Sequence, residues 1–478
     1  MITFLLCLVL LLTGYFVYGR LVEKRFAPTD EITPAFKLND GVDYMPMPVW
    51  KVFLIQLLNI AGTGPIFGAL SGALFGPIVY LWIVLGCVFA GAVHDFSVGM
   101  ISVRSGGSGI AEITGRLLGK KMLMVMRVFS VILLIMCGVV FTKGPADLLA
   151  ILTPEKLNAD FWFWVVLIYY FIATFLPIDK IIGRLYPVFG VLLIAMALGV
   201  AGSVLFSGKF QMPELWTSFE NLHPDGTEVW PFMFITVACG AISGFHATQT
   251  PIMARCIKSE KDGRRVFYGA MIAEGIIALI WAAAGVSCYE SGRALLDAGG
   301  GCSQVVYAIC QSTMGKIGCA LGLLGVIVCP LSSGDTAFRS ARLTIADWFK
   351  INQTPIKKRL LVTVPLLAVG FLISRIDYTV VWRYFSWANQ TLAMIALWAA
   401  ATYLFGQGKK YFIVFVPAAF MTAVTATYFC AAPECLGLMW TALGISKSIY
   451  YPAAIAAGLV CAFAAAWLFK KHIKHNNI

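Results

Sequence analysis

Charged residues are scarce in this chain of 478 residues, since Asp, Glu, Lys and Arg together make up only 13% of it. An ordinary soluble domain carries about 25%. Histidine occurs only five times, whereas 59% of the residues are apolar or aromatic. A soluble monomer of this size needs a large polar outer surface, which so few charges cannot supply. The shortage of charge excludes a soluble cytosolic enzyme and predicts a membrane protein that crosses the bilayer many times.

Motifs of several chemical classes are also missing. The sequence holds no phosphate-binding P-loop, no GxSxG nucleophile motif and no HExxH zinc motif. The net charge of +12 is not gathered on a soluble module with aromatic or polar readers, which a nucleic-acid partner requires. We therefore expect neither an enzyme nor a nucleic-acid-binding protein, and no cofactor other than a coupling ion.

Apolar stretches are present in the length that a helix needs to cross about 30 Å of hydrocarbon. They are continuously apolar, whereas barrel strands alternate. The sequence thus predicts an all-α polytopic membrane protein with about thirteen transmembrane helices. These lie near residues 1–18, 49–73, 77–100, 122–141, 161–178, 185–206, 229–254, 267–288, 317–338, 360–375, 378–404, 411–430 and 449–470.

The distribution of positive charge predicts the orientation. Most Lys and Arg residues fall on one set of alternate connections, among them Arg20 to Arg25, Arg255 to Arg265 and the C-terminal lysines. Positive loops stay on the cytoplasmic side. We expect an inner-membrane protein with its N-terminus outside and its C-terminus in the cytoplasm.

Helix breakers interrupt the second predicted span in its middle. The run Ala61–Pro65 contains Gly62, Thr63 and Gly64, and the proline removes a backbone hydrogen bond. Irregular backbone survives at membrane depth only where it lines a cavity, so these three residues are candidates for substrate binding. The alternative is a simple kink in a helix that packs through glycines spaced by four, from Gly64 to Gly76.

A second polar run with a breaker lies in the seventh predicted span. It extends from Ser243 to Pro251 and includes His246 and Gln249. The two runs lie five spans apart in chain order, with four helices between them, so the second enters the membrane from the opposite side, as in the inverted repeats of secondary transporters. Burial of a histidine inside a bilayer costs free energy, so a histidine at this position indicates a functional site. Ser243, His246 and Gln249 join the predicted substrate site.

Titratable and hydroxyl side chains lie near the ends of the third and ninth predicted spans. The predicted topology places them at the same depth in the membrane. Buried carboxylates and histidines of this kind are typical of proton pathways. Asp335, in the ninth predicted span, is one candidate for proton transfer, and its alternative is an ion pair with Arg339, one helical turn later. Glu274, in the eighth predicted span, is a weaker candidate for proton transfer. The candidates for coupling to protons, or to sodium through the three hydroxyls, are His94, Asp95, Ser332, Ser333, Asp335 and Thr336.

Two amides and several cysteines complete the set of polar groups. Asn389 and Gln390 lie near mid-membrane in the eleventh span, where they either bridge helices or contact substrate. Some cysteines flank predicted outer loops, where disulfides persist, and both disulfides and free thiols stay open for them. They are Cys288, Cys302, Cys310, Cys319, Cys430 and Cys435.

Six of these motifs, in this order, resemble the carbon starvation protein A (CstA) family of bacterial inner-membrane transporters. The motifs are Asp40–Tyr44, Ala61–Pro65, Gly91–Phe96, Ser243–Gln249, Ser332–Thr336 and Phe385–Gln390. The resemblance implies proton-linked uptake of small peptides during carbon starvation or, in a related branch, of pyruvate. A sodium-coupled amino-acid carrier is a further alternative, and a membrane-embedded enzyme or a nutrient sensor is a remote one.

The resemblance also implies a domain organisation like that of amino acid, polyamine and cation transporters. Their core is two inverted five-helix repeats whose first helices are broken. We expect an extra helix and loop at 1–48, the repeats at 49–206 and 207–404, and two extra helices at 405–478. The expected partners are the lipid bilayer and a di- or tripeptide or pyruvate, and the sequence does not fix the oligomeric state.

Overall fold

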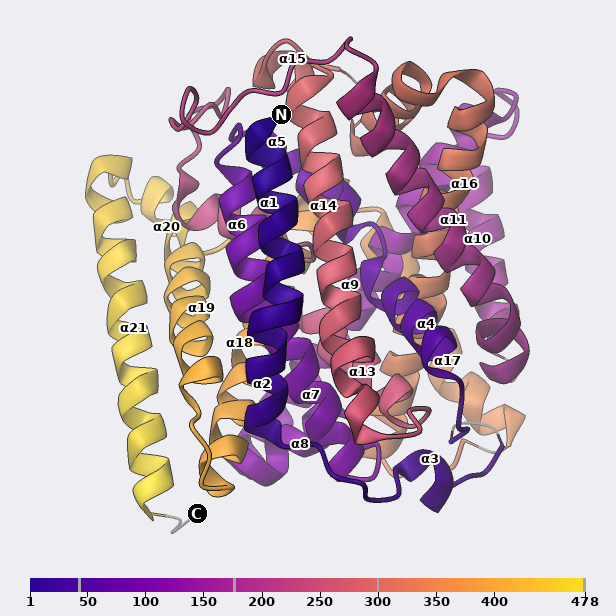
Figure 1. Ribbon diagram of the computed structural model, residues 1–478, viewed down its shortest axis with the longest axis vertical. Coiled ribbons are helices and arrows are strands. Elements are labelled where there is room, and N and C mark those ends of the chain that lie inside the picture. Colours follow the sequence, from indigo (N-terminus) through magenta and orange to yellow (C-terminus); the bar gives the residue numbers. More distant parts are fainter. Residues whose placement is uncertain (42–43, 175–177, 299–300, 354, 476–478) are drawn as a thin grey trace.

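Helices run side by side along the longest axis of the protein in a computed structural model (Figure 1). The structure describes residues 1–41, 44–174, 178–298, 301–353 and 355–475, and these ranges contain no strand. The prediction of an all-α fold is therefore confirmed. Val42 and Asp43 of one predicted motif, and residues 175–177 of one predicted span, lie outside the described residues.

Each of the thirteen predicted stretches contains helix. The main elements are α1 (Ile2–Thr13) with α2 (Gly19–Phe26), α4 (Val49–Ala61) with α5 (Ala69–Ala73), α6 (Val79–Gly86) with α7 (Ala92–Arg104), α9 (Lys120–Leu152), α10 (Ala159–Ala173), α11 (Ile178–Phe206), α12 (Phe234–Thr236) with α13 (Gly244–Ala254), α14 (Gly269–Ser287), α16 (Gly301–Trp348), α17 (Ile356–Ser374), α18 (Tyr378–Gly406), α19 (Phe412–Ala431) and α21 (Lys447–His475). Shorter connecting helices are α3 (Pro34–Lys37), α8 (Ile110–Leu118), α15 (Gly292–Leu296) and α20 (Leu436–Ala442).

Fewer than thirteen of these elements are long and apolar enough to cross a membrane as single helices. Within the described ranges eight meet that requirement, and nine do if the bent pair α4 and α5 counts as one span. The predicted count of thirteen is therefore too high by this measure. The segment 229–254 is broken into short helices, α10 has 15 residues, and α17 begins with Lys357, Lys358 and Arg359.

The two chain ends lie at opposite ends of the helical bundle (Figure 1). Met1 is at the top of the view, and the end of α21 is at the bottom. We call these the Met1 end and the C-terminal end. The helix α14 occupies the interior, since 89% of its apolar window is buried, whereas only 17% is buried in α21. The outer helices expose the apolar side chains that lipid covers.

Gly62 and Thr63 divide the first predicted broken helix. The helix α4 ends at Ala61, and the chain resumes in the helical turn Gly64–Gly68 and α5, bent by 55°. Gly62 has φ +51° and ψ −141°, a conformation that side chains with a Cβ rarely adopt. Pro65 lies in the first turn of the resumed helix, where its missing N–H costs nothing. The sequence prediction of an unwound centre here agrees with the structure.

The second break lies a few residues earlier than the polar run predicts. The helix α12 ends at Thr236, residues 237–243 are irregular, and α13 begins at Gly244. Pro251 is inside α13, so the polar run itself is helical. Ser243 has the extended conformation of a residue that precedes a helix, so the break ends at Ser243 and the polar residues after it form the first turns of α13.

The two breaks pack directly against each other. A Cβ added at Gly64 would collide with Cys239, one at Gly72 would collide with Val237, and one at Gly68 would lie 3.2 Å from the carbonyl oxygen of Thr236. The spacing by four places these glycines on one helix face. We call Gly64, Gly68 and Gly72 the glycine row. Close packing through this row and the break occur together, because the row lets the broken segments approach closely.

All thirteen cysteines are free thiols, including the six for which disulfides were one expectation. Cys310 and Cys319 are buried among helices, and Cys302 contacts the hydroxyl of Ser71 at 3.8 Å. The free-thiol alternative therefore describes the structure.

We predict that Gly64→Ala destabilises the protein. Its new methyl group meets Cys239, and overpacking of this kind costs about 1–3 kcal/mol. Thermal unfolding of the purified protein measures the loss. Gly202→Ala is the matched control, because nothing lies within 4 Å of a Cβ at that position of α11. An equal melting temperature for both variants would contradict the close contact between the breaks.

Candidate functional site

Four titratable side chains form a connected buried cluster beside the second break. One oxygen of the Asp95 carboxylate is hydrogen-bonded to Nδ1 of His94 and the other to Nδ1 of His246, each at 2.8 Å. On its other side, Nε2 of His246 lies 3.2 Å from Oε2 of Glu274. All four side chains have no exposed surface. Such a chain of acids and imidazoles can share and move protons.

Small residues bring the three helices of this cluster together. Asp95 and His94 stand in the first turn of α7, His246 in α13 and Glu274 in α14. A Cβ at Gly91, directly before α7, would collide with the carbonyl oxygen of Ala241 in the second break. Close backbone approach is therefore what places residues 151 positions apart in hydrogen-bonding contact.

The same cluster can hold a metal ion. Cys239, His246 and Glu274 each offer one ligand atom, and these atoms lie within 4.8 Å of one another. Thiolate, imidazole and carboxylate are the ligands that Zn²⁺ takes in proteins. The sequence predicted no confident metal site, because the three residues have no ligand spacing along the chain.

Asn389 of α18 holds the start of α13. Its Oδ1 accepts hydrogen bonds from the backbone N–H of Phe245 at 2.6 Å and from the hydroxyl of Ser243 at 3.1 Å. The first N–H groups of a helix have no partner within the helix, so a side chain from another element satisfies one here. In this conformation Asn389 therefore forms a bridge between α18 and the start of α13.

The other two amides of the predicted substrate site also contact protein groups. Nε2 of Gln390 donates to the carbonyl oxygens of Phe234 at 3.3 Å, in α12, and of Ala238 at 3.4 Å, within the second break. Nε2 of Gln249 donates to the hydroxyl of Thr248 at 2.9 Å. Oε1 of each amide has no hydrogen-bond partner among the described residues.

Unpaired polar atoms gather at the first break. Both side-chain polar atoms of Asn59 and the hydroxyl of Thr63 are buried and have no hydrogen-bond partner within the described part of the chain. The carbonyl oxygen of Leu58, freed by the end of α4, accepts from the hydroxyl of Ser333 at 2.9 Å. Unsatisfied groups in a protein interior are costly and point to a functional constraint.

The hydroxyls proposed for sodium bond mainly within their own helix. Ser332 donates to the carbonyl of Cys329 at 2.6 Å, and Thr336 donates to that of Ser333 at 3.0 Å. Among the three, Ser333 also reaches α4, at the carbonyl of Leu58. The structure thus brings one of the three predicted sodium ligands to the first break.

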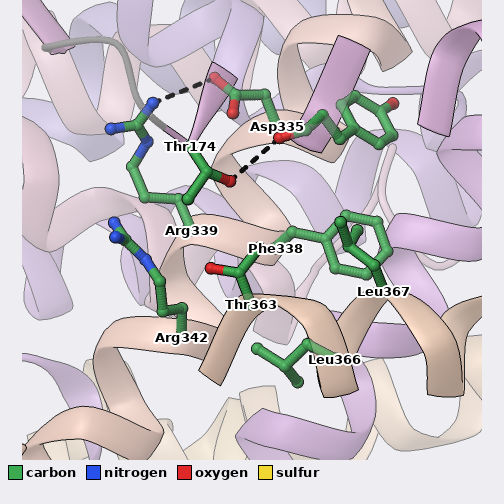
Figure 2. Close-up of a pocket in the computed structure, with 9 residues that line it drawn as sticks. Thr174, Asp335, Phe338, Arg339, Arg342, Thr363, Leu366 and Leu367 are labelled. Carbon is green, nitrogen blue, oxygen red and sulfur yellow. Dashed lines mark hydrogen bonds and ion pairs between the residues drawn. The ribbon is translucent and has the colours of Figure 1, made fainter. Parts of the chain in front are cut away.

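Asp335 stands apart from the cluster of His94, Asp95, His246 and Glu274. Its Oδ2 lies 3.5 Å from the guanidinium of Arg339, the ion pair considered from the sequence. Figure 2 shows this pair on one wall of a small cavity that Arg342 and Thr363 also line. The cavity measures about 10 Å³, enough for about one water molecule.

The predicted substrate residues are closed to both sides of the membrane in this conformation. Thr63, Ser243, His246, Gln249, Asn389 and Gln390 have no exposed surface. The ring of Phe141 covers Gly62 so closely that a Cβ there would lie 2.5 Å from it. Any solute that reaches these groups therefore needs the broken segments to move apart.

Sequence reasoning underrated two members of the site. Glu274 was a weaker candidate, although an acid inside an apolar span was a signal that deserved more weight. Cys239 was not among the predicted site residues, and only its place just before Gly240 at a break could have distinguished it. Neither residue has a motif that links it to His246.

Comparison with known sequences gives a family. The profile of the family described as "Carbon starvation protein CstA" matches residues 1–154, 149–297 and 295–428. An uncharacterised membrane protein of Haemophilus influenzae is 42% identical over 357 residues, which are 64% of this chain and 96% of that protein.

Two named transporters of Escherichia coli are also similar. The peptide transporter CstA is 26% identical over 332 residues, or 56% of this chain and 47% of that protein. The pyruvate/proton symporter BtsT is 26% identical over 333 residues, or 56% of this chain and 46% of that protein. The chain thus spans about half the length of the named transporters that it matches.

Solved structures show a similar fold. A manganese transporter of Eremococcus coleocola, in complex with an aromatic bis-isothiourea substituted compound, has a TM-score of 0.51 at 13% identity. The alignment covers 90% of this chain and 99% of that one. A mutant of the same transporter reaches a TM-score of 0.53 with the same coverage. At this identity the likeness concerns the fold alone.

We predict that Asn389→Ala lowers the melting temperature, because it leaves the N–H of Phe245 buried without an acceptor. The expected cost is about 1–3 kcal/mol. Thr402→Val is the control in the same helix, since among the described residues that buried hydroxyl bonds the carbonyl of Trp398 alone. Equal stability of the two variants in thermal unfolding would argue against the capping interaction.

Proposed function

Because the chain belongs to the carbon starvation protein CstA family, we propose that it is a proton-coupled secondary transporter that imports small peptides. The family and the solved structures of similar fold are membrane transporters, which agrees with the prediction that the chain is no enzyme. Of the two transport activities named among its relatives, peptide uptake is the one we favour. Pyruvate is the alternative substrate.

The observation that supports proton coupling is the contact of one carboxylate, Asp95, with two imidazoles. Because Asp95 accepts from Nδ1 of both His94 and His246, each ring carries a proton there. Nε2 of His246 and Oε2 of Glu274 then face each other as two acceptors, unless one further proton lies between them. That shared proton is the one we assign to transport.

Electrostatics connects this proton to the movement of the helices. Two carboxylates and two neutral imidazoles carry two negative charges, so the cluster is neutral only with two added protons. An uncompensated charge in a buried site within the membrane is expensive. The closed state therefore favours the fully protonated cluster, whereas an open, hydrated state tolerates the loss of a proton.

The position of the cluster connects it to the substrate. His246 is in the first turn of α13, and Cys239, next to the glycine row of the first broken helix, lies beside it. The groups that we propose for the solute are Gly62, Thr63 and Gly64 from one break, Ser243, His246 and Gln249 from the other, and Asn389 and Gln390. Separation of the two breaks would expose these groups, with the Met1 end facing outward as the charge distribution predicts.

The assignment favours Asp95 over Asp335 as the coupling carboxylate. Asp335 already has Arg339 as a counter-ion. Sodium at Ser332, Ser333 and Thr336 is the alternative coupling ion. For sodium the hydroxyls of Ser332 and Thr336 would have to turn away from their own helix.

We predict that Asp95→Asn abolishes accumulation of a dipeptide driven by a pH gradient, whereas counterflow exchange persists. The amide cannot accept from both imidazoles and carries no charge to balance. Proteoliposomes with an acidic exterior measure accumulation, and preloaded vesicles measure counterflow. Asp335→Asn, which removes a carboxylate charge outside the cluster, is the control and should retain gradient-driven accumulation. Uptake by both variants is normalised to the amount of folded protein. Undiminished accumulation by Asp95→Asn would contradict the proposal.

A divalent metal ion is a second candidate for the coupling ion or cargo, favoured by the ligand atoms of Cys239, His246 and Glu274. If protons alone are used, Zn²⁺ should still compete for these ligands and inhibit uptake. We predict that Cys239→Ala raises the half-inhibitory Zn²⁺ concentration about tenfold or more, the usual effect of weakening a metal site. Cys137→Ala, another buried thiol, is the control. Stimulation of uptake by Zn²⁺ would favour the metal as cargo or coupling ion.

A further inference from the structure

A cavity with charges of both signs opens between α9, α10 and α17. It measures about 210 Å³, well beyond the ~10–15 Å³ that one water needs. Lys143 and Asp147 come from α9, Asp160 from α10, and Arg375 from the end of α17. Two cationic and two anionic side chains thus surround one space. We call it the α9–α10–α17 cavity.

The inner pair of charges in this cavity is only partly used. The Asp147 carboxylate is half-buried and makes no hydrogen bond, and no ion pair within 4 Å, with any described residue. The ammonium of Lys143 donates one hydrogen bond, to the carbonyl of Ser374 at 3.0 Å, which leaves two donors. A half-buried carboxylate without a partner is a receptor for a cation, and a lysine beside it is a receptor for an anion.

The outer pair is exposed and easily exchanged. Arg375 and Asp160 approach to 3.6 Å, but their side chains are 52% and 74% exposed. Exposed ion pairs contribute little, so an incoming charged group can replace either partner at small cost. The guanidinium of Arg375 is therefore available to a carboxylate at the mouth of the cavity.

The cavity lies next to the first break. Gly144 follows Lys143, and a Cβ there would lie 3.3 Å from both Thr63 and the ring of Phe67. The ammonium of Lys143 lies 5.8 Å from the centre of the Tyr378 ring. Aromatic rings separate the cavity from the break, since Tyr378 stacks on Trp382 and Trp382 contacts Phe67.

Its position along the bundle fits the direction of import. The cavity is built where α9 nears its end, α10 begins and α17 ends, which is the Met1 end of the bundle. The charge distribution predicts that this end faces outward. A solute that comes from outside would meet this cavity before it meets the two breaks.

We propose that the α9–α10–α17 cavity is a docking site for a zwitterion, an amino acid or short peptide whose ammonium binds Asp147 and whose carboxylate binds Lys143 and Arg375. The proposal rests on the proposed transport function and extends it to a first binding step. Pyruvate has no ammonium and would leave Asp147 without a partner. A zwitterionic lipid headgroup shares the chemistry, so the experiment separates the two sources.

The test compares alanyl-alanine with N-acetyl-alanyl-alanine, which lacks the ammonium. The half-saturating concentration of each is measured by thermal shift of the purified full chain and by counterflow in vesicles free of phosphatidylethanolamine. Asp147→Asn should weaken binding of alanyl-alanine about tenfold or more and leave binding of the acetylated peptide unchanged, because the amide carries no charge to pair with the ammonium group. Glu155→Gln, an exposed acid between α9 and α10, is the charge-matched control.

The outcomes separate this site from the transport function. Unchanged preference for the free peptide in Asp147→Asn would overturn the docking site, even with counterflow intact. Failure of the wild type to exchange any peptide would overturn the proposed function, whereas loss of the thermal shift in Asp147→Asn would still support the site. An effect of Asp147→Asn that requires phosphatidylethanolamine would assign the cavity to a lipid headgroup and overturn the proposal.

Discussion

A helix that stops inside a bilayer leaves backbone groups that lipid cannot satisfy, and this constraint shapes the centre of the protein. Helices stop in this way after Ala61 and after Thr236. Side chains of other helices form hydrogen bonds with backbone groups at these interruptions. Asn389 accepts from the N–H of Phe245, and Ser333 donates to the carbonyl of Leu58. The glycine row beginning at Gly64 lets the interruptions lie against each other, so both become parts of one buried polar region.

The buried cluster gains its properties from that region. Asp95 and His246 belong to different helices, α7 and α13, and meet because the second break passes close to Gly91. In our proposal the proton between His246 and Glu274 is coupled to the packing of the breaks, since separation of the breaks would both hydrate the cluster and expose Thr63. A carrier needs such a link between an ion and the access to its solute.

Much of this architecture could be predicted from the sequence. Continuous apolar stretches indicated the helices, and Gly62 with Pro65 indicated the first break, because both features act locally along the chain. The ion pair of Asp335 with Arg339 was also foreseeable, since residues four apart share one helix face. The count of thirteen spans was too high by the criterion of length and composition, because breaks and charged ends shorten the apolar helices.

The composition of the site could be predicted only in part. His94, Asp95 and His246 were candidates, but the sequence did not indicate that they contact one another, because no spacing along the chain links α7 to α13. Cys239 and Glu274 join them through contacts between segments far apart in sequence. The polar residues Asn389 and Gln390 gave no sign that they hold the backbone of the second break, since an amide near mid-membrane serves helix or solute equally well.

The most direct test of the central claim is the labelling of Thr63→Cys by a membrane-impermeant thiol reagent, added to one side at a time. Labelling of the wild type, with its own thirteen cysteines, sets the background. We expect reactivity from one side at a time, with the reactive side reversed when the proton gradient is reversed, because the breaks separate toward one compartment in turn. A cysteine at this position that stays unreactive from both sides during active transport would contradict the account.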